Sequence, residues 1–260
     1  MSSSPTSSRN GRDLSNESYA GYYSNDMKTR LNKFLAERGV CSRRQADALI
    51  ESRKVKVNGS IAELGLQVNE QDEIIVSGKR IENVRQDKIY LAFHKPVGIM
   101  TSVDSKAKDT VRSFLNLKPG VFPVGRLDVA SSGLLLLTND GELSEHITHP
   151  RYDHEKEYLV TVDRVVRRED LRTMADGMMI LGSKTKPGVV KKIDDNRFSI
   201  ILTEGRNRQI RRMCEALGYE VKALRRVRVM NIELEDMPSG KTRPLSTKEI
   251  RELKQQLGIH

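Results

Sequence analysis

Two charged residues, Arg126 and Asp128, stand one residue apart a few positions before an apolar run at residues 134–137. A buried strand needs the apolar run, and the Asp140-Gly141 pair that follows it favours a hairpin or a loop. Neither of these elements needs a polar, turn-like segment in front of it. Because an aspartate is rarely buried without a partner, Asp128 is expected to be paired, to cap a turn, or to take part in chemistry.

Further candidate residues lie in two segments downstream. Residues 204–214 place Ile210 and Met213 at helical spacing, which predicts a helix with one apolar and one strongly basic face. Such a face is often simply solvated, but arginines are also suited to binding phosphate groups. The arginines of this segment are Arg206, Arg208, Arg211 and Arg212. In the second segment, residues 156–162, Tyr158 lies in an alternating pattern typical of a strand, where a tyrosine usually packs against its neighbours.

These residues must be positioned by the elements of one larger domain, which is expected over residues 89–260. Its pattern mixes short strands with a few helices and shows no regular alternation of the two, which predicts an α+β fold with a mostly antiparallel mixed sheet. The expected strands cover residues 89–93, 134–138, 157–162, 198–202 and 229–234. The expected helices cover residues 110–115, 168–174 and 206–217.

A smaller unit is expected before this domain, over residues 28–78, with a polar linker at residues 79–88. Residues 1–27 are rich in Ser, Asn and Gly and have few aliphatic side chains. Such a segment cannot bury enough apolar surface to offset the entropy of ordering. We therefore expect it to be a disordered tail.

Local signals in the small unit predict two short helices and a hairpin. Apolar residues repeat at helical spacing over residues 31–35, and Gly39 suits the end of that helix. The Ser-Arg-Arg-Gln sequence at residues 42–45 matches a capping box that begins a second helix. Residues 55–57 alternate like a strand and lead into Asn-Gly at residues 58–59, a strong hairpin signal.

The overall charge indicates a polyanionic partner. Lysine and arginine outnumber acidic residues 45 to 35, giving a formal net charge of +10 and a pI near 9.6. Such an excess points to nucleic acid first and to an anionic membrane second. Basic side chains crowd the small unit, at Arg30, Lys33, Arg43, Arg44, Arg53 and Lys54. A solvated surface would also explain them.

Several classes of protein are disfavoured by the composition. No apolar run approaches about 18 residues, so no membrane-spanning segment is expected. The two cysteines, Cys41 and Cys214, are isolated, and the five histidines do not cluster at ligand spacing. We therefore expect no disulfide framework, no metal and a cytoplasmic location.

The stretch from Gly125 to Gly141 resembles the active-site loop of the pseudouridine synthases, in the RsuA-like family that modifies ribosomal RNA. In that family the loop reads Gly-Arg-Leu-Asp, followed by a serine–glycine pair and a leucine strand, and its aspartate is catalytic. The resemblance implies that Asp128 is the catalytic residue here. It further implies that Tyr158 lies in the active site against the target base and that Arg211 pairs with Asp128.

The implied reaction breaks the bond between the ribose and N1 of uracil, turns the base over and joins the ribose to C5. Substrate and product contain the same atoms, so no cofactor is expected. Asp128 would act either as a nucleophile on the sugar or as a base on a ribose proton, and the sequence leaves both open. Arg126 is expected to fill the space that a flipped base leaves or to hold the adjacent phosphate. The expected phosphate-binding residues nearby are Arg206, Arg208 and Arg212.

The small unit resembles the αL RNA-binding module of a small-subunit ribosomal protein. The resemblance rests on Arg-Leu-Asn-Lys-Phe-Leu at residues 30–35, Ser-Arg-Arg at residues 42–44 and Val-Lys-Val-Asn-Gly at residues 55–59. In that module the second helix and the following loop bind structured RNA through phosphates, which orients the RNA but reads no sequence. The residues implied are Arg43, Arg44, Arg53 and Lys54, with Arg30 and Lys33 beside them.

Within the family, residues 154–163, 180–182 and 207–214 resemble the RluF-like and RluB-like branch, and the RluF-like members most. That branch acts on large-subunit (23S) ribosomal RNA, and RluF-like members also act on a tyrosine transfer RNA. We therefore expect a monomeric RNA-modifying isomerase that works without a cofactor. The alternative is a non-catalytic RNA-binding or ribosome-assembly protein with the same fold, against which the intact set of candidate active-site residues argues.

Overall fold

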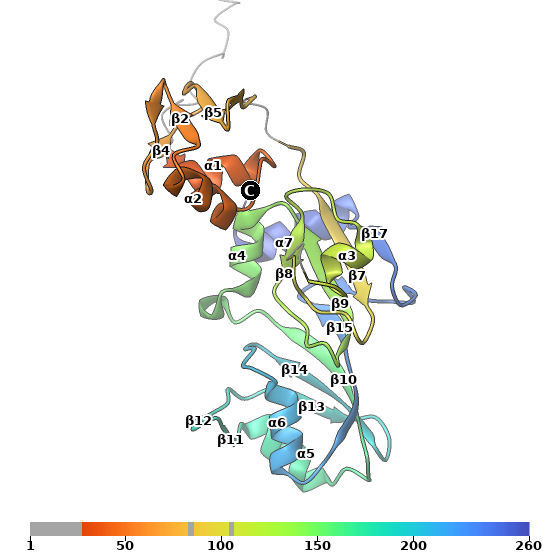
Figure 1. Cartoon of the computed structure of the whole chain (residues 1–260). Coiled ribbons are helices and arrows are strands. Elements are labelled where there is room, and N and C mark those ends of the chain that lie inside the picture. The colour runs from red at the N-terminus through yellow and green to blue at the C-terminus, as the bar shows by residue number, and fades with distance from the viewer. Residues whose placement is uncertain (1–27, 83–85, 104–106, 260) are drawn as a thin grey trace, which may run out of the picture.

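The computed structural model describes residues 28–82, 86–103 and 107–259. The tail predicted over residues 1–27 lies outside the described residues. Figure 1 shows a small unit of short helices and strands at one end of the molecule and a long sheet running through the remainder. The strands of this sheet hold the loops that carry the candidate active-site residues.

The small unit packs two helices against short strands around its own apolar core. Core side chains come from both helices and from the strands, among them Leu31, Phe34, Ile50 and Ile74. The helices are α1 (Leu31–Glu37) and α2 (Arg43–Glu51). The four-stranded antiparallel sheet has the order β3 (Ser60–Ile61), β2 (Val55–Val57), β5 (Ile74–Val76) and β6 (Lys79–Arg80), and a separate pair joins β1 (Thr29–Arg30) to β4 (Gln67–Val68).

The local signals predicted in the small unit are confirmed. The Ser42 hydroxyl accepts a hydrogen bond from the backbone N–H of Gln45, and the Gln45 side chain accepts one from the Ser42 N–H at 2.9 Å. This reciprocal pair is the capping box that begins α2. Gly39 ends α1 with a φ of +68°, while Asn58 and Gly59 turn the β2–β3 hairpin with φ angles of +49° and +83°. All three residues adopt the left-handed conformation that glycine and asparagine tolerate best.

The sheet of the small unit continues into the range predicted as a linker. Ile75 of β5 pairs with Arg80 of β6, and Val76 pairs with Lys79. Both residues of β6 are exposed at the edge of the sheet. Charged residues are typical of an exposed edge strand, where they discourage pairing with other chains. The polar character of residues 79–80 therefore belongs to a strand, and the connection to the large domain begins after it.

The large domain contains a nine-stranded sheet that is mostly antiparallel, as predicted. Its order is β13-β14-β10-β15-β9-β7-β17, with β16 added to β15 and β8 added to β9. Among the described strands of this sheet, the pair β15–β9 alone is parallel. The strands are β7 (Tyr90–Lys95), β8 (Phe122–Val124), β9 (Ser132–Thr138), β10 (Lys156–Val162), β13 (Val189–Lys192), β14 (Arg197–Leu202), β15 (Val221–Val229), β16 (Ile232–Glu233) and β17 (Thr242–Pro244).

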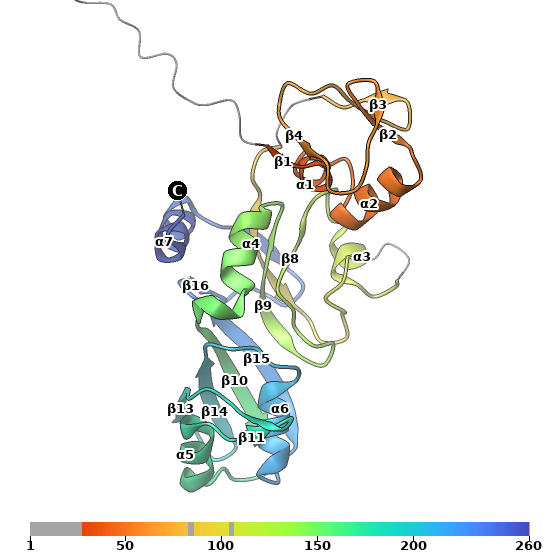
Figure 2. The ribbon, with the colours of Figure 1, turned by 90° about the vertical axis from the view of Figure 1, so that its left-hand side faces the viewer.

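Strand β9 is covered on both of its faces. Leu134 and Leu136 pack in a cluster with residues of α4 and α7, whereas Leu135 and Leu137 pack in a second cluster with Val111 of α3. Burial on two sides explains the continuous leucine run, because a strand with one covered face alternates apolar and polar residues. Figure 2 shows α4 beside β8 and β9. The helices are α3 (Val111–Leu115), α4 (Gly141–Thr148), which is followed by the 3-10 turn η1 (Pro150–Tyr152), and α7 (Thr247–Leu257).

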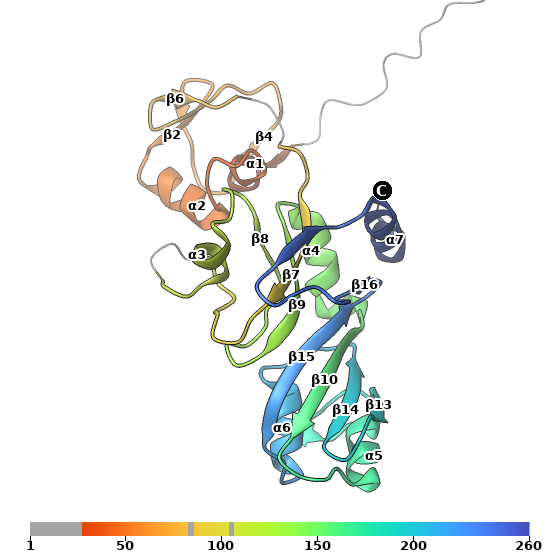
Figure 3. The ribbon, with the colours of Figure 1, turned by 90° about the vertical axis from the view of Figure 1, so that its right-hand side faces the viewer.

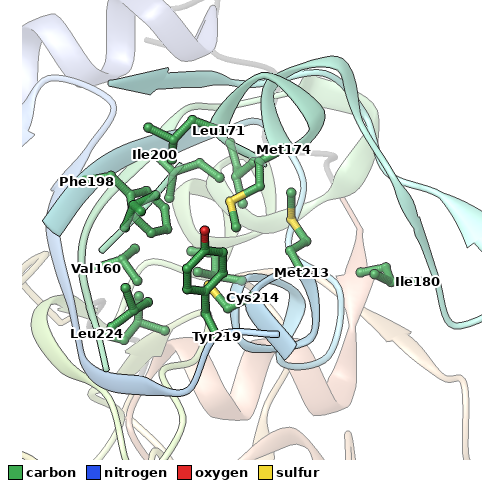
Figure 4. Packing of buried hydrophobic residues seen from close by; sticks show 14 residues of the cluster. Val160, Leu171, Met174, Ile180, Phe198, Ile200, Met213, Cys214, Tyr219 and Leu224 are labelled. Atoms are coloured by element: carbon green, nitrogen blue, oxygen red, sulfur yellow. The ribbon is translucent and has the colours of Figure 1, made fainter. Parts of the chain in front are cut away.

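The other half of the sheet, from β13 to β15, carries two helices on one face. Phe198 and Ile200 of β14 pack with Met174 of α5 and Met213 of α6 in the cluster drawn in Figure 4. Figure 3 shows β15 and β10 running side by side along this half. The helices are α5 (Arg168–Asp176) and α6 (Gln209–Ala216), and a small hairpin joins β11 (Met179–Ile180) to β12 (Ser183–Lys184). This half therefore has an apolar core separate from that around β9.

Three sequence predictions in this domain are wrong in detail. Asp140 begins α4 instead of a hairpin, because its carboxylate accepts a hydrogen bond from the backbone N–H of Leu143 at 3.4 Å. The strand predicted over residues 229–234 is two strands, since Met230 turns the chain with a φ of +53° and β16 pairs back onto Val229. The helix predicted from residue 206 begins at residue 209.

Candidate active site

Asp128 lies in the loop between β8 and β9, and this loop is fixed to the segment that follows β7. The Thr101 hydroxyl donates to the Leu127 carbonyl at 2.8 Å and accepts from the Leu127 N–H at 3.2 Å. One residue beyond Asp128, the Val129 carbonyl accepts from the Gly98 N–H at 2.8 Å. Bonds on both sides of Asp128 therefore hold its backbone in place.

The same loop leads into the junction between the two halves of the sheet. Ser132 and Gly133, at the start of β9, pair with Arg225 and Arg226 of β15 in the parallel pair. Gly133 has a φ of +110°, and a Cβ atom there would lie 2.1 Å from the Arg226 carbonyl oxygen. Only glycine allows the two strands to approach this closely. Asp128 is thus placed four residues before the junction at which the halves of the sheet meet.

A cavity of about 420 Å³ opens beside Asp128. Asp128 is half-buried in its wall, between exposed Arg126 and Val129. The wall combines three segments: the loop after β7, the loop before β9, and the residue that precedes α6. The lining residues are Val97, Gly98, Met100, Thr101, Arg126, Leu127, Asp128, Val129, Ala130 and Arg208. A carboxylate with two nearby guanidinium groups at a cavity wall is suited to acid–base or nucleophilic chemistry on an anionic substrate.

Arg211 contacts this loop but does not pair directly with Asp128. Its Nη2 donates to the Ala130 carbonyl at 2.8 Å, and its Nη1 donates to the Val221 carbonyl at 3.3 Å. Within the described residues no ion pair joins Arg211 to Asp128, so the direct pairing implied by the resemblance is not formed. Burial lowers the pKa of the Arg211 guanidinium, Arg208 lowers it further, and the negative charge of Asp128 opposes both. Arg211 therefore acts on Asp128 through the loop and through space.

A buried lysine, Lys95, is a second electrostatic neighbour of Asp128. The side chain of Lys95 is fully buried at the end of β7. Its Nζ donates to the carbonyls of Pro96 at 2.8 Å and Ile99 at 2.7 Å. Burial lowers the pKa of Lys95 to about 8, and the negative charge of Asp128 opposes that shift. Nothing in the Lys95-Pro96 sequence signals that the lysine is buried.

Arg226 is a third cation that the sequence analysis missed as a site residue. Its side chain is 4% exposed. The Nε donates to the Leu134 carbonyl at 2.7 Å, and Nη1 donates to the Arg126 carbonyl at 3.4 Å. One feature indicates that the Arg226 side chain is buried. Leu224, two residues before it on β15, is buried, and residues two apart in a strand share a face.

The structure places Tyr158 in a central strand of the large sheet. Tyr158 lies in β10, half-buried, with its backbone paired to Ile200 on one side and Arg226 on the other. Its side chain packs against the apolar clusters of both halves of the sheet, including the cluster that contains Leu127. Tyr158 is absent from the lining of this cavity, and its contact with a target base stays a prediction.

The arginines predicted to bind phosphates near the site differ in what they contact. Arg206 donates to the Ser183 and Lys184 carbonyls and to Glu204, which fixes the β11–β12 hairpin to the start of α6. Arg212 donates to the Asn207 carbonyl and side chain. Arg208 is exposed in the cavity wall, and its side chain makes no hydrogen bond or ion pair with any described residue. Of the three, Arg208 alone has a side chain free of bonds to the described residues, while phosphate binding by all three stays a prediction.

The predicted RNA-binding residues of the small unit are all at its surface. Each of the six is exposed. Of these six, only Lys33 forms an ion pair with a described residue, Glu37 at 3.7 Å. None of them lines the cavity beside Asp128. The six are Arg30, Lys33, Arg43, Arg44, Arg53 and Lys54. They form a basic surface separate from the cavity.

The described residues contain neither a metal-binding cluster nor a membrane-spanning helix. No three histidine, cysteine or acidic side chains there come together in a group that would hold a metal ion. No helix in the same ranges has both the length and the apolar character needed to cross a bilayer.

Comparison with known proteins assigns both units. A family model described as RNA pseudouridylate synthase matches residues 89–216, and a model of the S4 domain matches residues 29–74. The chain is 46% identical over 229 residues to the dual-specificity RNA pseudouridine synthase RluF of Escherichia coli K12, covering 88% of this chain and 79% of that protein. It is 38% identical over 234 residues to the ribosomal large subunit pseudouridine synthase B of Bacillus subtilis 168, covering 86% and 95%.

A solved structure of a pseudouridylate synthase supports the same assignment. It is 35% identical and superposes with a TM-score of 0.64, covering 86% of this chain and 99% of that one. These likenesses extend over both the S4 domain and the catalytic domain, and they favour the enzyme over the non-catalytic alternative. The chain belongs to the RNA pseudouridine synthase family, in its RsuA-like branch, and is RluF-like within it.

Proposed function

We propose that this pseudouridine synthase converts a specific uridine of large-subunit ribosomal RNA, with Asp128 as its catalytic carboxylate. One observation carries the proposal: Asp128 is half-buried in a cavity wall that also contains Arg126 and Arg208. The cavity thus offers one reactive anion beside two groups that bind phosphate. The large-subunit target is supported by the relative from Bacillus subtilis, whose name refers to that RNA.

The reaction needs one anionic group beside the ribose of the target nucleotide. Asp128 either attacks the sugar or removes a ribose proton, the bond to N1 breaks, and the ribose is rejoined to C5 of the turned uracil. No atoms are gained or lost, so the proposed step requires no cofactor. Lys95 and Arg211 supply positive charge beside a carboxylate that must act as an anion.

Binding of the RNA is divided between the two units in this proposal. The exposed cations of the small unit hold phosphates of structured RNA, which places the duplex without reading its sequence. At the cavity, Arg126 occupies the space left by the flipped uridine or holds the neighbouring phosphate, and Arg208 binds a phosphate as well. Tyr158 lies against the target base in this proposal, and Arg211 holds the loop that carries Asp128 through the Ala130 carbonyl.

Three finer assignments complete the proposal. The relative from Escherichia coli is named dual-specificity, so a transfer RNA is a second candidate substrate. Because one chain contains both the basic surface and the cavity, a monomer is sufficient for activity. A ribosomal RNA substrate places the enzyme in the cytoplasm.

The test uses unmodified RNA transcripts labelled with tritium at C5 of uracil. Joining the ribose to C5 releases this tritium, so the label reports the proposed reaction directly. Purified protein without added cofactor is incubated with large-subunit ribosomal RNA and, separately, with tyrosine transfer RNA. Release from the ribosomal RNA, with pseudouridine mapped to one position, is the expected result. Release from transfer RNA alone, or from neither RNA, would overturn the proposed target.

A further inference from the structure

The wall of the active-site cavity contains a group of exposed apolar side chains. Val97, Met100 and Val129 line the cavity and are 62%, 46% and 43% exposed. Single exposed apolar residues are ordinary on protein surfaces. Three that line one cavity are not, because gathered apolar surface usually marks a contact with a ligand or partner. We call these three residues the apolar shelf.

The backbone holds the shelf in place. The hydrogen bond from the Gly98 N–H to the Val129 carbonyl joins the two loops that carry it. The Met100 N–H donates to the Asp109 carbonyl at 2.8 Å, and the Met100 carbonyl accepts from the Val111 N–H at 2.9 Å. Ile99, next to Met100, packs toward the apolar cluster beneath. The shelf therefore cannot turn inward without breaking these bonds.

The charged residues that line the cavity indicate the kind of ligand that it binds. Arg126 and Arg208 add two guanidinium groups to the same wall. A nucleotide presents both kinds of surface, an anionic phosphate and a flat base whose faces are only weakly hydrated. The combination fits a stretch of RNA that lays its phosphates on the arginines and a base face on the shelf.

We propose that the apolar shelf binds the base next to the target uridine, on one side of it in the strand. This rests on the function proposed above. A uridine that leaves its stack deprives its neighbours of a stacking partner, and an apolar surface offsets that loss. The target uracil itself is a poorer occupant, because it must turn over during the reaction and needs an enclosed site. Side chains that are 43% to 62% exposed suit a base that stays in the strand.

The test is a double-mutant cycle that combines a change in the protein with the removal of a base from the RNA. The protein variant is Val97→Ala/Met100→Ala, which leaves Val129 and the neighbouring Asp128 untouched. The matched control is Val165→Ala/Met179→Ala, at residues 59% and 61% exposed that lie outside the cavity wall. The substrates are a synthetic RNA hairpin with the mapped uridine and two versions that lack the base on its 5′ or 3′ side.

On the complete hairpin, kcat/KM of the shelf variant is expected to fall about tenfold, as for the loss of a few buried methylene groups. On one of the two abasic hairpins, parent and shelf variant are expected to differ by less than about twofold, because the contact is already absent. The control variant should match the parent on all three RNAs. Equal thermal midpoints for all proteins show that folding is unaffected.

Two results would overturn the inference while leaving the proposed function intact. One is a shelf variant as active as the parent on the complete hairpin. The other is a tenfold defect that persists on both abasic hairpins, which would assign the shelf to the target uracil or to no base at all. If the parent modifies no RNA, the proposed function fails, and the inference fails with it.

Discussion

The basic residues of the two folded units differ in what their side chains touch. In the small unit, Arg43, Arg44, Arg53 and Lys54 are exposed, and their side chains make no hydrogen bond or ion pair with the described residues. We call these the exposed cations. In the large domain, the anchored cations Lys95, Arg211 and Arg226 donate to backbone carbonyls at or beside the loop of Asp128.

The exposed cations are suited to binding RNA, whereas the anchored cations are suited to positioning the loop of Asp128. An exposed side chain can move onto a phosphate and contributes mainly to affinity, which depends on salt. An anchored side chain has already used its donors, so it fixes backbone and supplies a charge of fixed position. Loss of an exposed cation should raise KM, whereas loss of an anchored one should reduce stability or kcat.

Arg226→Ala is expected to have the largest effect of any change in an anchored cation. It leaves the carbonyls of Leu134 and Arg126 without their donor beneath the loop of Asp128, which should cost about 3–5 kcal/mol of unfolding free energy. Urea unfolding measures this cost. Arg226→Lys should recover part of it, since one donor returns. An alanine variant as stable as the parent would show that the guanidinium is not structural.

Lys95 should give the stability of the protein a dependence on alkaline pH. Its pKa is lowered from 10.5 in the unfolded chain to about 8 in the folded state. Between these values the unfolded chain binds more protons, so this group makes stability rise with pH, by up to about 3 kcal/mol. In Lys95→Met that rise should be missing when unfolding free energies of parent and variant are compared from pH 7 to 10. Lys79→Met, at an exposed lysine, serves as control. If the unfolding free energy of Lys95→Met followed the same pH dependence as that of the parent, the lowered pKa of Lys95 would be refuted.

Arg211→Lys is expected to affect turnover more than binding. A lysine cannot donate to the Ala130 and Val221 carbonyls in the geometry of the guanidinium, so the loop loses one support. We expect kcat to fall about 100-fold and KM to stay within about twofold, with the overall fold retained. Steady-state kinetics with the mapped RNA measure both. A higher KM at an unchanged kcat would place Arg211 among the RNA-binding residues instead.

Arg43→Ala/Arg44→Ala is expected to have the smallest effect. Both side chains are exposed on α2, and the Ser42 cap remains, so folding should be unchanged. KM should rise about tenfold at moderate salt with kcat retained, and the slope of log affinity against log salt should fall by about two. The matched control is Arg168→Ala/Arg172→Ala, two exposed arginines of α5. Equal losses in both variants would mean that the effect is net charge alone.

The same contrast explains how much the sequence could predict. In the small unit, structure follows from local signals such as the Ser42–Gln45 capping box, and the predicted elements are confirmed. In the large domain the strands β7, β9, β10 and β14 were predicted, but β8, β13, β17 and nearly all of β15 were missed, and no local signal indicates that β9 lies parallel to β15. Asp140 was misread because an aspartate that caps a helix and one in a turn have the same local sequence.

The site was predictable to the extent that its residues belong to one segment. Arg126, Asp128 and the strand after them are contiguous, and Arg208 was found as part of a basic helix. Lys95 and Arg226 were missed as site residues because their role depends on burial and on carbonyls that are distant in the sequence. Such contacts arise from the pairing of strands, which periodicity alone does not determine.

The most direct test of Asp128 as the catalytic residue compares Asp128→Asn with the parent in two measurements on the same RNA. One is the affinity for the mapped RNA, and the other is the rate of tritium release in a single turnover with all RNA bound. We expect an affinity within about twofold of the parent and a rate reduced at least about 1,000-fold, since the amide can neither attack the sugar nor accept a proton. A rate within tenfold of the parent would contradict the assignment of Asp128 as the catalytic residue.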